Sequence, residues 1–507
     1  MFSIDNISHA MYLLFDARVL FTIVWASLYG IFVGAVPGLT ATMAAALLVP
    51  VTFFMEPVPA LAAMVSMTAM AIFAGDIPGT LLRIPGTPSS AAYVEDSFAL
   101  TKQGKASHVL GIQVLASSIG GLFGTFVLIL LAPRLAEVAM RFSTFEYFWL
   151  ACLGLSCAVL ISSGSTSKAL LSLLIGLLLN SVGMDITLGF PRFTFNAPEL
   201  FDGFSFIPVM IGMFGMAEII RNVLAMSESR LAPVVVQTGQ IFKGTWRTLR
   251  ENWKHMCRSF AAGTGIGVLP GAGADIAAWV SYGIAKRFAR KPEDFGKGSY
   301  EGIVAAGTAN SASLAGAWVP ALVFGIPGDS ITAIIIGVLF MQGLQPGPMI
   351  FERTPEIILA VYGAFIIANL LLVPFGWLAI KLSSKVLRVP NYTLYPIILI
   401  FCIVGAFAIN NSLFDVKVML AFGIIAYFME ANEIPVAPAI LGLVLGNLLE
   451  SSFMRSMMIS RWNLAAFFER PISAVLGVIV ILLWLTPVFI FVIKKCVSYS
   501  KKRSSKE

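Results

Sequence analysis

Long apolar runs separated by short polar connections dominate the chain. Many of the runs extend for about 20 residues, the length that an α-helix needs to cross the hydrocarbon core of a bilayer. They are continuously apolar and lack the two-residue alternation of a membrane β-strand, so the pattern predicts helices throughout. The runs suitable for spanning begin near Val19, Ala60, Val109, Phe145, Ala169, Phe206, Ser259, Glu356, Thr393, Val416, Ile434 and Ile472. The segments from Ala41 to Val51 and from Gly302 to Gly347 fit half-helices, hairpins or full spans equally well.

The composition agrees with this pattern. Of the 507 residues, 58% are hydrophobic and 12% are charged, against roughly 25% charged residues in an average soluble chain. Such a chain has too few polar residues to surround an ordinary core, which excludes a soluble enzyme. The five cysteines are odd in number and show no CxxC spacing, which excludes a disulfide scaffold. The composition therefore predicts an all-α polytopic membrane protein.

The net charge of +7 is explained by where the basic residues lie along the chain. Basic residues concentrate in a central stretch, residues 221–258, and in the tail, residues 494–507. By the positive-inside rule both are predicted to be cytoplasmic, so the charge does not indicate nucleic-acid binding. Asp5 and Asp16 precede the first basic residue, Arg18, so the N-terminus is predicted to lie outside. The number of spans is then odd.

An internal repeat is the most informative feature. The pattern G-x-x-x-G-x-x-P-G at residues 30–38 recurs at residues 263–271, and I-P-G follows each copy, at residues 84–86 and 326–328. A pattern duplicated in two halves of a membrane chain is typical of a secondary transporter. The sequence predicts two related repeats of inverted topology, with a first repeat at 1–220, a linker at 221–258, a second repeat core at 259–380, C-terminal helices at 381–493 and the tail at 494–507.

The Pro-Gly pairs predict broken helices. Proline removes a backbone N–H and glycine tolerates positive φ, so Pro-Gly inside an apolar run ends or breaks a helix. The freed backbone groups are tolerable in a membrane only where they are buried in protein or line a watery cavity. Half-helix N-termini then attract anions, and freed carbonyls bind cations. We expect re-entrant hairpins around Pro78–Ser90 and Asn310–Pro348, with an organic carboxylate bound between them.

Polar residues near these breaks supply the candidate site. Hydroxyl and amide groups bind solutes without a permanent charge, and a guanidinium at membrane depth requires a partner such as a substrate carboxylate. We expect Arg83→Ala to abolish uptake while expression persists. The candidate substrate-binding residues are Gly38, Thr40, Arg83, Gly86, Thr87, Ser89, Ser90, Asn310, Ser311, Gly328, Asp329 and Ser330. The candidate ion-coupling residues are Asp76, Asp275 and Thr308.

Plainer interpretations compete with these. A single Pro-Gly pair is usually a kink, and the two GxxxG motifs are more often helix-packing faces than ligand contacts. Arg83 fits a snorkelling role at the membrane surface, and the hydroxyls fit bonds to their own helices. The sequence holds no H-E-x-x-H, G-x-S-x-G or P-loop motif, which predicts no enzyme activity, no cofactor and no metal beyond a transported sodium ion.

The repeated motifs together resemble a known family. They comprise both copies of G-x-x-x-G-x-x-P-G, I-P-G-T-P-S-S at 84–90, D-F-G-K-G-S-x-E-G at 294–302, G-I-P-G at 325–328 and G-L-x-P-G-P at 343–348. Together they resemble the large membrane subunit, the TctA type, of the tripartite tricarboxylate transporters. The resemblance implies a bacterial inner-membrane permease that works with a small four-span membrane subunit and a periplasmic solute-binding protein. It also implies uptake of organic acids driven by an ion gradient, with sodium as the expected ion.

The chain departs from the family pattern at two places. Where the family usually reads P-E-x-x-N-N-A, residues 306–312 read A-G-T-A-N-S-A, and Arg83 stands where members commonly carry an asparagine. An added cation beside the site favours an anionic solute. The alternative function is a non-transporting membrane scaffold or receptor subunit that docks a periplasmic binding protein.

Overall fold

The structure, a computed structural model, describes residues 3–162, 165–185, 189–224, 241–271, 273–387 and 391–485. The basic tail and residues 225–240 of the central stretch lie outside the described residues. The described part is almost entirely helical, with one short antiparallel hairpin in which β1 (Gly183–Met184) pairs with β2 (Pro191–Arg192). The predicted all-α class is confirmed apart from this hairpin.

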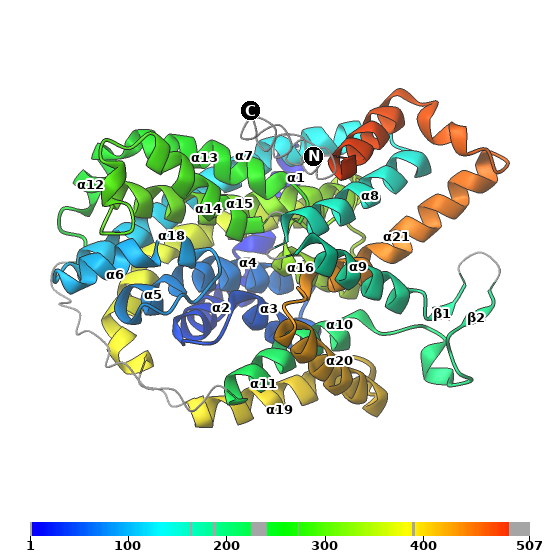
Figure 1. Cartoon of the computed structure of the whole chain (residues 1–507), viewed down its shortest axis with the longest axis horizontal. Helices are drawn as coiled ribbons and strands as arrows, with labels where there is room; N and C mark the ends of the chain where they lie inside the picture. Colours follow the sequence, from blue (N-terminus) through cyan, green and yellow to red (C-terminus); the bar gives the residue numbers. More distant parts are fainter. Residues whose placement is uncertain are drawn as a thin grey trace, which may run out of the picture.

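Helices follow one another along the first half of the chain with short connections (Figure 1). Their bounds are α1 (Ile4–Leu14), α2 (Ala17–Ala35), α3 (Ala41–Thr52), α4 (Pro57–Ala74), α5 (Asp76–Leu82), η1 (Ser90–Ala92), α6 (Val94–Lys102), α7 (Ala106–Ala139), α8 (Thr144–Ile161), α9 (Thr166–Asn180), η2 (Pro198–Leu200), α10 (Phe206–Met210), the π-helical η3 (Ile211–Met216) and α11 (Ala217–Leu224).

The second half continues in the same way. Its helices are α12 (Thr245–Glu251), α13 (Trp253–Val268), α14 (Gly273–Arg287), η5 (Pro292–Asp294), α15 (Tyr300–Phe324), α16 (Ser330–Met341), α17 (Ile350–Arg353), α18 (Pro355–Val386), α19 (Asn391–Asn410), α20 (Leu413–Ala431), α21 (Ala437–Ile459), η6 (Leu464–Phe468) and an unlabelled helix, Pro471–Leu485.

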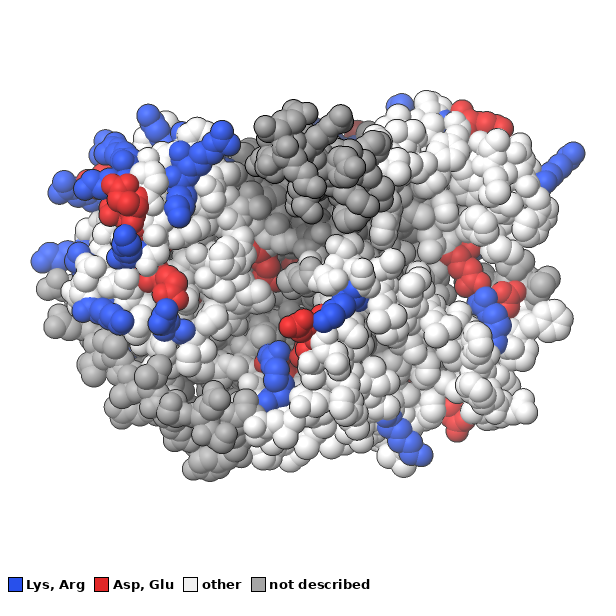
Figure 2. Space-filling view, in the orientation of Figure 1, with Lys and Arg blue, Asp and Glu red and all other residues white. Residues whose placement is uncertain are grey.

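Six helical segments of the described part are long and apolar enough to cross a membrane. These are Ala17–Ala35, Pro57–Leu82, Ala106–Ala139, Phe206–Leu224, Pro355–Ser383 and Ala437–Ile459. Much of the surface carries neither acidic nor basic side chains, as the white area of Figure 2 shows. A multi-pass membrane protein follows from these helices, because an uncharged surface of this extent suits hydrocarbon rather than water.

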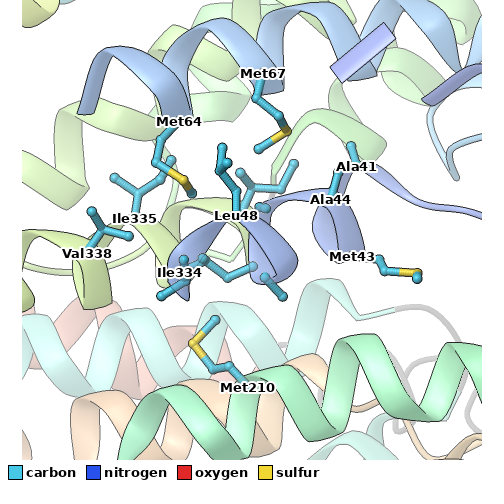
Figure 3. Packing of buried hydrophobic residues seen from close by; sticks show 14 of the residues in the cluster. Ala41, Met43, Ala44, Leu48, Met64, Met67, Met210, Ile334, Ile335 and Val338 are labelled. Carbon is cyan, nitrogen blue, oxygen red and sulfur yellow. The ribbon is translucent and has the colours of Figure 1, made fainter. Parts of the chain in front are cut away.

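Two short helices, α3 and α16, lie inside the molecule. Each has 12 residues, too few to cross a bilayer alone. Figure 3 shows Ala44 and Leu48 of α3 packed among Met64 of α4, Ile334 of α16 and Met210 of α10. Both helices are nearly all apolar, which fits an element surrounded by other helices on every side. The segments from Ala41 to Val51 and from Gly302 to Gly347, for which the sequence allowed half-helices, hairpins or full spans, therefore each contain a half-helix.

The glycine motifs pack helices closely. A Cβ atom on Gly30 would lie 2.3 Å from the carbonyl oxygen of Met67, and one on Gly263 would lie 2.7 Å from that of Ala309. Gly34 meets Ala71 and Gly267 meets Ser313 in the same way. Because only glycine leaves room for two backbones at this distance, α2 packs tightly on α4, and α13 on α15. The packing-face interpretation of both motifs is confirmed.

Helix α15 occupies the centre of the second half. Its residues from Gly302 to Val323 are all buried, although many are alanine, glycine or serine. Gly120 and Gly124 of α7 face the backbone of α15, and a Cβ atom on Gly120 would lie 2.3 Å from the carbonyl oxygen of Thr308. Small residues on both helices allow this approach, so α7 of the first half and α15 of the second are held rigidly together.

Candidate functional site

The first I-P-G segment folds back onto the helix that precedes it. Pro78 has no N–H to donate to the carbonyl of Ala74, and the helix is interrupted at that point: α4 ends at Ala74 and α5 begins at Asp76. The carbonyl of Gly75 instead accepts a hydrogen bond from the N–H of Gly86 at 3.1 Å. A Cβ atom on Gly86 would lie 2.6 Å from the Cα of Gly75. Only glycine fits there, so Gly86 places the loop that follows.

The second I-P-G segment repeats this geometry. Helix α15 ends at Phe324, and a Cβ atom on Gly328 would lie 2.8 Å from the Cα of Ala317. Gly325 adopts a left-handed conformation and its N–H donates to Ala321, while Ile326 donates to Pro320. In the first segment Arg83 and Ile84 make the same two bonds, to Gly79 and Pro78. Both helices thus end in the same C-terminal motif.

Each segment then forms a capping box. The hydroxyl of Thr87 accepts from the N–H of Ser90 at 3.1 Å, and the hydroxyl of Ser90 accepts from the N–H of Thr87 at 3.2 Å. The carboxylate of Asp329 accepts from the N–H of Thr332 at 2.7 Å, and the hydroxyl of Thr332 accepts from the N–H of Asp329 at 2.8 Å. These reciprocal bonds fix the start of α16 and the turn that precedes η1.

The other two Pro-Gly pairs also lead into helix starts. Gly38 and Gly271 have positive φ angles of 88° and 77°, which reverse the chain after α2 and α13. Thr40 then caps α3 by accepting from the N–H of Met43 at 3.2 Å, and α14 begins at Gly273. Four helix starts, one after each Pro-Gly pair of the two repeated motifs, are therefore built at the same kind of break.

These four starts surround one cavity of about 510 Å³. Each break contributes to its wall, and α11, α20 and the start of α21 complete it. The polar residues in the lining are Thr40, Thr42, Thr87, Ser89, Ser162, Asp275, Trp279, Asp329, Ser330, Glu218, Arg221 and Glu430. Segments that are far apart in the sequence thus meet at a single polar space inside an apolar molecule.

The cavity carries more acidic than basic side chains. Arg221, the one basic residue in its described lining, forms ion pairs with Glu218 and, at 3.3 Å, with Glu430. Asp275 and Asp329 have no ion-pair partner among the described residues. Asp275 accepts a hydrogen bond from the N–H of Ser89 at 3.1 Å. The side chains therefore favour a cation, while the N-termini of α3, α14 and α16 present N–H groups and positive dipole ends that favour an anion.

The structure brings six of the fifteen candidate residues together at this cavity. Thr40, Thr87, Ser89, Asp275, Asp329 and Ser330 line the cavity. Gly38, Gly86, Ser90 and Gly328 lie in the turns behind it, where they fix the backbone. Asp76, Thr308, Asn310 and Ser311 are buried in α5 and α15 and are absent from its lining. Asp76 accepts a hydrogen bond from the Tyr93 hydroxyl at 2.6 Å, and its other carboxylate oxygen, Oδ2, is buried without a partner.

Arg83 lies elsewhere, contrary to expectation. Its guanidinium pairs with Glu95 of α6 at 2.9 Å, is about half exposed, and does not line the cavity. The physical reason is its position: Arg83 is the left-handed residue that ends α5, so its side chain leaves the helix before the chain turns toward the cavity. A carboxylate of the protein, not of a substrate, is its partner.

Sequence reasoning missed Glu218, Arg221 and Glu430 as site residues. Glu218 and Arg221 stand three residues apart at the end of an apolar run, a spacing that places both on one helix face. An opposite-charge pair at the end of a membrane helix was the available signal. From the sequence, Arg221 belongs only to the basic stretch at residues 221–258, because nothing in the sequence shows that α11 meets α20.

Comparisons with known proteins agree with this picture. The sequence model of one protein family, the Tripartite tricarboxylate transporter TctA family, matches residues 20–441 of this chain. An uncharacterized 52.8 kDa protein in the TAR-I ttuC′ 3′ region of Agrobacterium vitis is 35% identical over 455 residues, which cover 89% of this chain and 90% of that protein. An uncharacterized protein in the TAR-II ttuC′ 3′ region of the same organism is 37% identical over 228 residues, or 44% of this chain and 94% of that protein. No solved structure matches the chain.

Proposed function

We propose that this chain, which belongs to the tripartite tricarboxylate transporter TctA family, imports an organic carboxylate through the cavity described above. The family supplies the premise of a permease subunit in a three-part transporter. One observation carries the rest: four helix starts, each following a Pro-Gly break, converge on a single polar cavity. In transporters, broken helices near the midplane bind substrate and coupling ions in this manner.

The charges of the cavity support a coupled mechanism. A carboxylate that approaches the N-termini of α3, α14 and α16 also approaches Asp275 and Asp329, which repel it. A cation bound at these two aspartates removes the repulsion, so the anion and the cation bind better together than alone. We propose sodium as this ion, with the hydroxyls of Thr87 and Ser330 as further oxygen donors. Binding that requires both partners is the basis of symport.

Two inverted repeats would move the substrate by alternating access. The proposal is supported by the equivalent contacts at Gly86 and Gly328 and by the equivalent capping boxes at Thr87 and Asp329. The close contact of α7 with α15 supports movement of the halves about a shared, rigid core. In this scheme the cavity opens first to one side of the membrane and then to the other.

The remaining parts of the proposal concern partners and location. Membership of a tripartite family implies further subunits, for which we propose a small four-span membrane protein and a periplasmic solute-binding protein. We place the chain in the bacterial inner membrane, with the N-terminus in the periplasm and the C-terminus in the cytoplasm, from the distribution of basic residues.

The test is uptake of labelled carboxylates into proteoliposomes. The vesicles hold this chain and its small membrane partner, the purified binding protein is outside, and sodium and proton gradients are imposed separately. We expect one acid to accumulate only with an inward sodium gradient. Accumulation driven by protons alone would overturn the choice of sodium. No accumulation of any acid, with both partners verified as bound, would favour the non-transporting scaffold.

A further inference from the structure

A second cavity of about 510 Å³ opens at the other end of the second half. It lies between the start of α13, the end of α12 and the chain from Phe288 to Glu301. None of its described lining residues belongs to the lining of the first cavity. Figure 2 shows basic side chains gathered over the part of the molecule where Figure 1 places α12 and α13.

Unpaired cations line this second cavity. Lys254, Arg258, Arg290 and Lys291 all contribute to its wall, and no salt bridge to any of them occurs among the described residues. Three acidic residues also line the wall: Glu251 pairs with Arg247 outside it, Glu301 faces His255 at 3.9 Å, and Asp294 has no salt bridge among the described residues. The four basic side chains outnumber the three acidic ones in the wall, so the cavity carries a net positive charge that favours an anion.

His255 gives an independent indication of a ligand. Its side chain lines the cavity, yet the residue is only 8% exposed. The Nδ1 atom is buried and has no hydrogen-bond partner in the described structure. A buried polar atom without a partner costs about 1–3 kcal/mol, so such atoms normally bind water or a ligand. An anion bound between the four cations and Nδ1 would offset the positive charge of the wall and would also give Nδ1 a hydrogen-bond partner.

The rim indicates where that anion comes from. Phe288 in the wall and Trp253, which stands between the lining residues Asn252 and Lys254, are both exposed, and the Arg258 guanidinium lies 4.3 Å from the centre of the Phe288 ring. Exposed aromatic residues beside basic ones are typical of the headgroup level of a membrane. The same stretch is predicted to be cytoplasmic by its charge, and the cytoplasmic leaflet carries anionic lipids.

We propose that this cavity binds a phosphate group, supplied by the headgroup of an anionic phospholipid. The four cations bind the phosphate oxygens, His255 donates a hydrogen bond through Nδ1 at the inner wall, and the acyl chains leave past the aromatic rim. A lipid held here would brace α12 and α13 against the membrane face of the second half. The proposal does not depend on which solute the first cavity carries.

The test measures binding of short-chain lipids to the delipidated full chain in detergent by native mass spectrometry. The ligands are dioctanoyl phosphatidylglycerol, dioctanoyl phosphatidylcholine and inorganic phosphate. The test variant is R290Q/K291Q, which removes two exposed charges from a loop. The control is K102Q/K105Q, which removes two exposed charges beside α6 and α7 but leaves the cavity intact. Thermal unfolding of each variant confirms that folding is preserved.

We expect phosphatidylglycerol to bind saturably and phosphatidylcholine weakly. Each lost cation near a membrane surface weakens anion binding about fivefold, so R290Q/K291Q should bind phosphatidylglycerol roughly 25-fold less tightly. The control should bind as the parent does, and millimolar inorganic phosphate should compete. Equal binding by R290Q/K291Q and the parent would overturn the site. Binding of inorganic phosphate without phosphatidylglycerol would overturn the lipid as the source.

Discussion

The carboxylate of Asp275 accepts a hydrogen bond from the backbone N–H of Ser89, although 186 residues separate the two in the chain. The bond joins the first I-P-G segment to the start of α14 at the wall of the first cavity. One helical turn later, the Trp279 indole donates to the carbonyl of Pro88 at 3.3 Å. The loop that carries Thr87 and Ser89 therefore rests on the second half of the chain.

Asp275→Asn should separate the charge of this residue from its structural role. The amide oxygen still accepts from Ser89, so the loop keeps its position, but the negative charge that we assign to sodium binding is gone. Coupling between two bound ligands is typically worth about 1–3 kcal/mol, so losing this charge should lower sodium-driven uptake roughly 5- to 150-fold. Initial uptake rates at several sodium concentrations measure this.

Asp5→Asn is the matched control, because Asp5 is exposed on α1 and far from the cavity lining. It should transport at the parent rate. If Asp275→Asn also retained the parental rate and sodium dependence, the coupling ion would bind elsewhere, and the buried Asp76 would be the next position to change.

Two arginine substitutions distinguish the cavity from its surroundings. Arg221→Gln leaves Glu218 and Glu430 unpaired at the cavity wall, which repels an anionic substrate. The guanidinium is about half exposed, so solvent screening reduces the effect, and we expect the KM for the carboxylate to rise about fivefold. Arg83→Gln removes a pair outside the cavity and should leave KM within twofold of the parent. The reverse order of effects would return Arg83 to the substrate site.

Gly86→Ala tests the close contact that places the first I-P-G loop. The added Cβ would lie 2.6 Å from the Cα of Gly75, so the loop must shift, at a cost of about 1–3 kcal/mol. We expect a lower unfolding temperature and a loss of uptake. Gly283→Ala in α14 is the control, because nothing lies within 4 Å of its added Cβ. Equal unfolding temperatures for the two variants would show that the contact at Gly75 is not tight.

Much of the fold is predictable from hydrophobicity alone. Within the described residues, each apolar run named from the sequence lies wholly or largely in helices, because a segment that enters hydrocarbon must satisfy its backbone groups internally. The half-helices α3 and α16 are harder to predict from the sequence, since an apolar run of 12 residues fits either a buried element or part of a membrane span. Which of these applies depends on what packs around the run, and that is a property of the whole fold.

Only the backbone breaks that form the site could be predicted from the sequence, and the pairing of its side chains could not. Pro-Gly pairs predicted the breaks, and Thr87, Ser89, Asp275 and Asp329 line the cavity as a consequence. The side-chain pairing of Arg83 with Glu95 was not predictable, because twelve residues and a turn separate them. The pairing of Arg221 with Glu430 depends on contact between α11 and α20, more than 200 residues apart, which no local pattern reveals.

Asp96→Asn tests why the D-F-G-K-G-S motif is glycine-rich. The buried carboxylate of Asp96 accepts hydrogen bonds from the N–H groups of Gly296, Gly298 and Ser299 at 2.7–2.9 Å. These N–H groups form the kind of nest that binds phosphate in other proteins, but here a carboxylate of the same chain fills it. Removing the charge should destabilise the protein by about 1.5–3 kcal/mol and expose this loop to proteolysis. Glu293→Gln, an exposed neighbour, should do neither; equal unfolding temperatures and cleavage rates for both variants would leave the nest without a structural role.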